Sequence, residues 1–127
     1  MKLSDIKTLF EQQTSLNLFK EKIGQEVAEY KNRSCKRGGS NPIYLDEDVQ
    51  LLQIINDDIK FLSKTFLEGS INEWELNYIA EGLLLSEKVS YENDKIEEAL
   101  LNMADPEFFI LDTKDLMKDI LKDLERK

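Results

Sequence analysis

Apolar side chains recur at steps of three and four residues along most of this chain, which is the spacing of one face of an α-helix. The first such stretch covers residues 3–10, and Ser4 is predicted to cap it. Thr14-Ser15 interrupts this stretch and can cap a second helix, which is predicted to end near Cys35. Both patterns indicate amphipathic helices.

The longest apolar stripe lies in the middle of the chain. Its members are spaced by three or four residues and are Val49, Leu52, Ile55, Ile59, Leu62 and Phe66. Asp46 is predicted to cap a long helix here, because Glu47 and Asp48 would then lie at its positive N-terminal end. Gly69 is predicted to close this helix in a left-handed conformation. We therefore expect one continuous helix from Asp46 to Phe66.

Three more helices are predicted downstream, each from its own start signal. Ser70 and Glu73 match a capping box for the first. Ser90 or Asn93 is expected to cap the second, and the third begins near residue 112. With no convincing strand, the pattern predicts an all-α fold, a single compact bundle of about six helices, in one domain spanning residues 1–127.

The segment NEWELNYIAEGLLLSE, residues 72–87, has an unusually wide apolar arc for a helix. A helix of this kind packs against several neighbours. Four residues are predicted to lie in the core, namely Leu76, Ile79, Leu83 and Leu84. The polar remainder consists of Glu73, Asn77 and Glu81. Trp74 is interpreted either as a buried residue or as an exposed partner anchor.

The formal net charge is −9, and the acidity is concentrated in the centre of the chain. Residues 38–112 contain four basic and seventeen acidic side chains. Such a surface repels nucleic acid and anionic lipid and attracts basic partners, although acidity can equally serve solubility alone. No apolar run has the length of a secretory signal or a membrane span, so a cytoplasmic protein with no membrane partner is expected.

Catalytic chemistry finds little support in the composition. The chain has no histidine, which removes the usual general base and the commonest transition-metal ligand. Asp57 and Asp58 are conceivable Mg²⁺ ligands, but a solvated helix surface is favoured. The loop KRGGSNP, residues 36–42, lacks the phosphate-binding loop pattern. We therefore expect a protein that is not an enzyme and has no metal or other cofactor.

Residues 74–107, WELNYIAEGLLLSEKVSYENDKIEEALLNMADPE, resemble a helix–loop–helix segment ending in "DPE" that is found in small acidic bacterial proteins. Some of these are immunity proteins of contact-dependent or polymorphic toxin systems. The resemblance covers about a quarter of the chain. It implies a protein that binds and neutralises one cognate toxin, often a nuclease, and it assigns no binding residues.

An acidic surface suits such a partner, because a nuclease needs a basic groove for its phosphate substrate. The residues predicted to contact the partner are mainly carboxylates, with two aromatic anchors: Asp46, Glu47, Asp48, Asp57, Asp58, Glu73, Trp74, Glu81, Glu87, Tyr91, Glu92, Glu97 and Glu98. Reversing Asp57 and Asp58 to lysine is expected to slow association more than it affects folding. The alternatives are a helical adaptor with an unrelated protein partner and, with less support, a carboxylate–metal enzyme.

Overall fold

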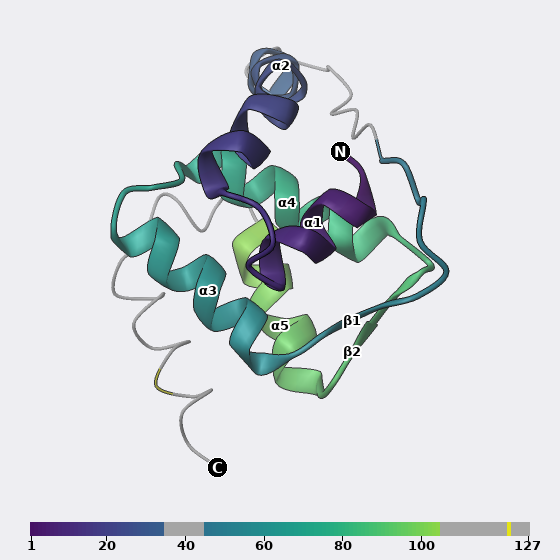
Figure 1. The fold of residues 1–127 in the computed structure, drawn as a ribbon. Coiled ribbons are helices and arrows are strands. Elements are labelled where there is room, and N and C mark those ends of the chain that lie inside the picture. The colour runs from purple at the N-terminus through teal and green to yellow at the C-terminus, as the bar shows by residue number, and fades with distance from the viewer. Residues whose placement is uncertain (35–44, 105–121, 123–127) are drawn as a thin grey trace.

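The computed structural model describes residues 1–34, 45–104 and 122, and this part of the chain is mostly helical (Figure 1). The elements, in chain order, are α1 (Leu3–Phe10), α2 (Leu16–Ser34), β1 (Leu52–Ile54), α3 (Asn56–Leu67), α4 (Glu73–Leu85), β2 (Val89–Tyr91) and α5 (Asp94–Ala104). The described residues thus contain five helices, against about six expected. The helix predicted near residue 112 lies outside the described residues, as do Cys35 and the loop 36–42.

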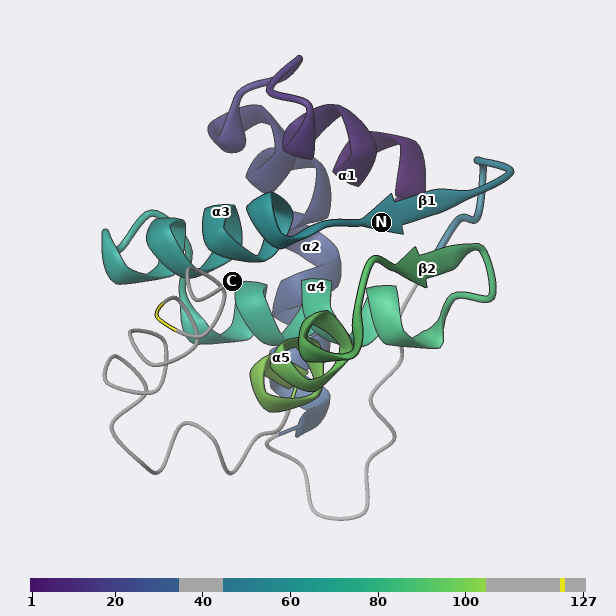
Figure 2. The same ribbon diagram turned by 90° about the horizontal axis from the view of Figure 1, so that it is seen from below.

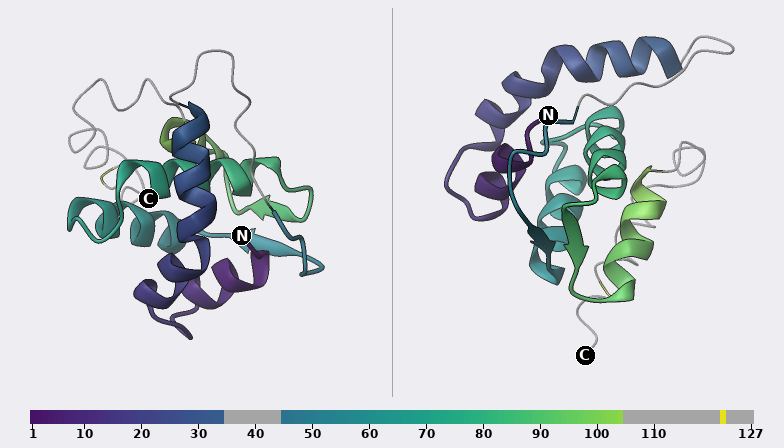
Figure 3. Two further views of the ribbon diagram at one scale, coloured as in Figure 1. Left: turned by 90° about the horizontal axis from the view of Figure 1, so that it is seen from above. Right: turned by 90° about the vertical axis from the view of Figure 1, so that its right-hand side faces the viewer.

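Helix α4 occupies a central position and packs against α2, α3 and α5. Helix α2 crosses over it on one side of the molecule, as both views in Figure 3 show. The side chains of Leu76, Ile79 and Leu83 are at most 1% exposed. The wide apolar arc of this segment therefore predicted its burial correctly, and Leu84 also packs against the core while being partly exposed.

The expectation of no strand is wrong. Strands β1 and β2 form a two-stranded parallel ribbon in which Leu52 pairs with Val89 and Ile54 pairs with Tyr91. Figure 2 shows the two arrows side by side and pointing the same way. Parallel strands need a crossover connection, and α3 and α4 supply it here.

The single long helix predicted from Asp46 is also wrong. Leu52 and Ile54 are buried while Gln53 between them is exposed, which is the alternation of a strand. Leu52 is followed by Ile54 at the strand step of two and by Ile55 at the helical step of three, so the local pattern fits both elements and the pairing with β2 decides between them. Asp46 caps no helix; its backbone instead forms a bridge with Lys2.

Helix α3 ends as the sequence indicates. Gly69 has φ +79°, which an L side chain rarely adopts, and the amides of Gly69 and Ser70 donate to the carbonyls of Phe66 and Thr65 at 3.0 and 2.9 Å. These are the two hydrogen bonds of a Schellman motif. The amide of Ile71 also donates to the Thr65 carbonyl, at 3.4 Å.

The start of α4 lies two residues later than predicted. Ser70 belongs to the turn that closes α3, so it does not cap the next helix. The capping box is formed by Asn72 and Glu75: the Glu75 amide donates to Asn72 Oδ1 at 2.9 Å, and the Asn72 amide donates to Glu75 Oε1 at 2.8 Å.

The other predicted caps have mixed outcomes. Ser15 Oγ accepts from the Leu18 amide at 3.1 Å, which confirms the predicted cap of α2. Asn93 Oδ1 accepts from the Ile96 amide at 3.3 Å, so Asn93 and not Ser90 caps α5. Ser4 lies inside α1, whose N-cap position is taken by Lys2.

Candidate functional site

The structure separates the predicted partner-binding residues into groups. One group precedes the two strands, a second follows them, and a third lies on α4. The remaining carboxylates, Glu97 and Glu98, are exposed on α5.

The first group lies on two segments, 45–51 and 85–88, which lead into β1 and β2 and are called the strand-entry corner below. Its carboxylates are Asp46, Glu47, Asp48 and Glu87, and all four are exposed. Glu47 Oε1 accepts hydrogen bonds from Ser86 Oγ at 2.6 Å and from the Glu87 amide at 3.2 Å, and so joins the two segments. The corner is therefore an acidic surface in which the position of Glu47 is set by hydrogen bonds.

Asp48 is held in the same way, against α1. Its two carboxylate oxygens accept from the Ser4 amide at 2.9 Å and from Ser4 Oγ at 2.6 Å. The hydrogen bond from the Ser4 hydroxyl, followed by that from the Ser4 amide, lowers the pKa of the Asp48 carboxyl, and nearby Lys2 adds to the effect. Asp48 therefore stays ionised to lower pH than an ordinary aspartate.

The second group, the strand-exit cluster, is formed where β1 and β2 end. Asp57 and Asp58 follow β1, Glu92 follows β2, and Glu11, the residue after α1, lies close enough to influence Asp58 electrostatically. Glu92 Oε2 accepts from the Asn56 amide at 3.2 Å. Because the carboxyl ends of parallel strands meet at one edge, residues distant in sequence gather here.

Asp58 differs from its neighbours because it is only 8% exposed. Its Oδ2 accepts from the Ile55 amide at 3.0 Å, at the start of α3. Burial raises the pKa of this carboxyl; the Ile55 amide partly opposes that, and the negative charges of Asp57, Glu11 and Glu92 add to it. Asp58 therefore acts as a helix cap, while Asp57 presents an exposed charge.

Beside this cluster is a recess of about 190 Å³ between α1 and β1. It has apolar and charged walls, formed by Lys7, Phe10, Glu11, Leu52, Gln53, Ile55 and Asp58. Its lining includes two carboxylates and one lysine, so the lining has a net negative formal charge.

The third group lies on α4 and does not form a common surface. Glu73 is exposed, whereas Trp74 and Glu81 are half-buried against α2. The Trp74 ring makes an edge-to-face contact with Tyr30, with centroids 6.2 Å apart, and Glu81 Oε2 accepts from the Tyr30 hydroxyl at 2.9 Å. Trp74 is thus integrated into the α2–α4 packing, and only part of it is presented to solvent.

The polar residues that connect α2, α4 and α5 were missed by the pattern analysis. Asn77, assigned to the polar face of α4, is only 1% exposed and is hydrogen-bonded to Tyr30. Its Nδ2 donates to the carbonyls of Met103 and Ala104, at 3.3 and 2.5 Å, at the end of α5. The sequence did contain one sign that Asn77 is buried, because core residues border it on the same helix.

Tyr78 extends this polar connection toward the N-terminus. It is fully buried, its ring lies edge-to-face on Tyr30, and its hydroxyl donates to Glu26 Oε1 at 2.8 Å. Glu26 also pairs with the Met1 amino group.

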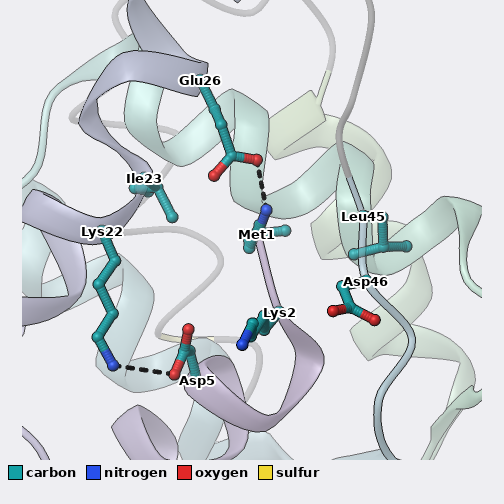
Figure 4. Close-up of a pocket in the computed structure, with 8 residues that line it drawn as sticks. All are labelled: Met1, Lys2, Asp5, Lys22, Ile23, Glu26, Leu45 and Asp46. Carbon is teal, nitrogen blue, oxygen red and sulfur yellow. Dashed lines mark hydrogen bonds and ion pairs between the residues drawn. The ribbon is translucent and has the colours of Figure 1, made fainter.

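Glu26 also lines a pocket of about 620 Å³ (Figure 4). Charges of both signs line it, together with three apolar side chains: Met1, Lys2, Asp5, Lys22, Ile23, Glu26, Leu45 and Asp46. Lys22 Nζ pairs with Asp5 Oδ1 at 3.2 Å, so charges on the wall neutralise each other. Asp46 is the one predicted partner-binding residue in this lining.

The described residues contain no group of three or more acidic, cysteine or histidine side chains placed to hold a metal ion. None of the helices in this part of the chain combines the length and apolarity needed to cross a bilayer.

Comparison with known proteins finds no matching family model, no matching curated protein and no matching solved structure.

Proposed function

We propose that this chain is an immunity protein that binds and neutralises a cognate, basic, nuclease-type bacterial toxin in the cytoplasm. The observation that carries the proposal is the placement of carboxylates at both ends of the β1–β2 ribbon. At the entry corner, Glu47 and Asp48 are held by hydrogen bonds while remaining exposed. At the exit, Asp57 and Glu92 are exposed around the buried Asp58.

Fixed carboxylates favour binding of a basic surface for two reasons. Their positions are already set by hydrogen bonds, so less side-chain freedom is lost when a partner binds. Their negative field also raises the rate of encounter with a positively charged groove, and this effect weakens as salt screens it. A protein that covers such a groove prevents the toxin from reaching nucleic acid.

The direct test is co-expression with the product of the reading frame immediately upstream. The proposal expects that product to arrest growth when expressed alone, growth to be restored by this chain, and the two proteins to form a stoichiometric complex. Failure of the purified proteins to bind in a pull-down would overturn the proposal.

A further inference from the structure

Two leucines at the strand-entry corner are far more exposed than a leucine in a folded core. Leu51 is 63% exposed and Leu85 is 65% exposed, the highest values among the large hydrophobic residues that the structure describes. Leu51 immediately precedes β1, and Leu85 is the last residue of α4.

The two leucines lie on segments that are joined by hydrogen bonds. Leu52, next to Leu51, donates its amide to the Lys88 carbonyl at 2.8 Å. Ser86, next to Leu85, donates its hydroxyl to Glu47 at 2.6 Å. Figure 1 shows both segments turning at the same corner of the molecule, and Figure 2 shows them at the same end of the ribbon.

The charge at this corner indicates which kind of partner surface can cover the leucines. The four carboxylates of the corner outnumber its one cation, Lys88, even when the adjacent Lys2, which bridges to Asp46, is added; both lysines are exposed. A partner that buries the leucines must therefore bring apolar side chains together with excess positive charge.

We propose that the strand-entry corner is the docking surface for an amphipathic basic segment of the partner protein. Apolar side chains of that segment pack on Leu51 and Leu85, while its lysines or arginines face the carboxylates around them. The identity of the partner as a toxin rests on the proposed function, whereas the leucine-and-carboxylate surface does not.

The first experiment maps a probe onto the full chain by methyl NMR. The probe is a synthetic helical peptide with leucines at three- and four-residue steps and lysines between them. The expected result is peptide-dependent shifts at Leu51 and Leu85, reduced by raised salt, with Leu18 and Leu101 unaffected. The latter two are matched controls, because they are 46% and 54% exposed on α2 and α5.

The second experiment uses paired variants with the same peptide. Leu51→Ser combined with Leu85→Ser is expected to weaken peptide binding roughly tenfold, since apolar contact area is lost. Leu18→Ser combined with Leu101→Ser is expected to leave binding unchanged. Circular dichroism and the thermal midpoint confirm that each variant remains folded.

Several outcomes would overturn the inference. One is equal shifts at all four leucines, or none at Leu51 and Leu85. Another is concentration-dependent shifts at the corner without peptide, which would show that a second copy of this chain covers it.

Binding of the product of the upstream reading frame distinguishes the proposed immunity function from the proposed docking surface. If it binds the Leu51→Ser, Leu85→Ser variant as tightly as the unaltered chain, the docking inference fails and the proposed function stands. If it does not bind the unaltered chain while the peptide still maps to the corner, the proposed function fails and the docking surface stands.

Discussion

Asn77 illustrates how strongly one polar side chain depends on its surroundings. It is buried and hydrogen-bonded to Tyr30 on α2, and it donates to the carbonyls of Met103 and Ala104 at the end of α5. One amide group therefore links three helices. A carbonyl at a helix end has no partner within the helix, so a buried end needs a donor of this kind.

Replacing Asn77 by alanine is expected to lower the free energy of unfolding by about 1–3 kcal/mol, because buried polar groups would lose their partner. Urea denaturation measures the change. Asn102→Ala is the matched control, since Asn102 is exposed on the neighbouring helix α5. A cost no greater than that of the control would contradict the role assigned to Asn77.

Glu81 provides a prediction about pH. Burial raises the pKa of its carboxyl in the folded protein, and the hydrogen bond from Tyr30 only partly offsets this. A carboxyl whose folded pKa lies above its unfolded pKa contributes stability that is present below the unfolded value and lost as pH rises through the folded value.

As pH rises above the ordinary glutamate pKa, the free energy of unfolding of the unaltered protein is therefore expected to fall, in part because Glu81 ionises. Glu81→Gln is expected to make this fall smaller. Urea unfolding of both proteins across the acidic range measures the difference between them. A difference that stays constant with pH would show that Glu81 titrates alike in the folded and unfolded chain.

At the scale of elements, helix boundaries follow local hydrogen bonds that several residues compete to make. Ser70 and Asn72 are both common N-cap residues. The carbonyl of Thr65 engages the amides of Ser70 and Ile71, so the turn after α3 extends through them. Asn72 is then the first residue with a side chain free to cap α4.

Asn72→Ala is expected to lower the free energy of unfolding by about 1 kcal/mol, because the Glu75 amide loses its acceptor. Ser70→Ala is expected to change it by less than about 0.5 kcal/mol, the range of ordinary surface substitutions. Thermal or urea unfolding of the pair distinguishes the two caps, and the reverse order of effects would restore Ser70 as the cap.

At the scale of the whole molecule, the parallel ribbon arranges the charge. At one end it gathers carboxylates from α3, from the residue after α1 and from the segment after β2, and at the other end from two further segments. Reversing the charge of Asp57 together with Asp58 would also disturb folding, because Asp58 is buried and caps α3. Asp57 alone is exposed and suitable.

Asp57→Lys is expected to slow association with the upstream product about threefold at low salt, with the difference shrinking as salt increases. Stopped-flow fluorescence measures the rate. Glu21→Lys on α2 makes the same change in net charge at an exposed site remote in sequence from the ribbon. Equal rates for the two variants would mean that total charge, and not its position, governs association.

The sequence by itself determined the mostly helical character, the burial of α4, the left-handed turn at Gly69 and the cap of α2, and it narrowed the cap of α5 to Ser90 or Asn93. These depend on periodicity and on hydrogen bonds between residues close in the chain, so a local pattern is enough. Tertiary structure alone decided that Leu52 and Ile54 form a strand, that Asp58 and Asn77 are buried, and that Leu51 and Leu85 share an acidic corner. Each of these depends on a partner many residues away, such as β2 for β1 or α5 for Asn77. The periodicity of a single segment carries no information about such a distant partner.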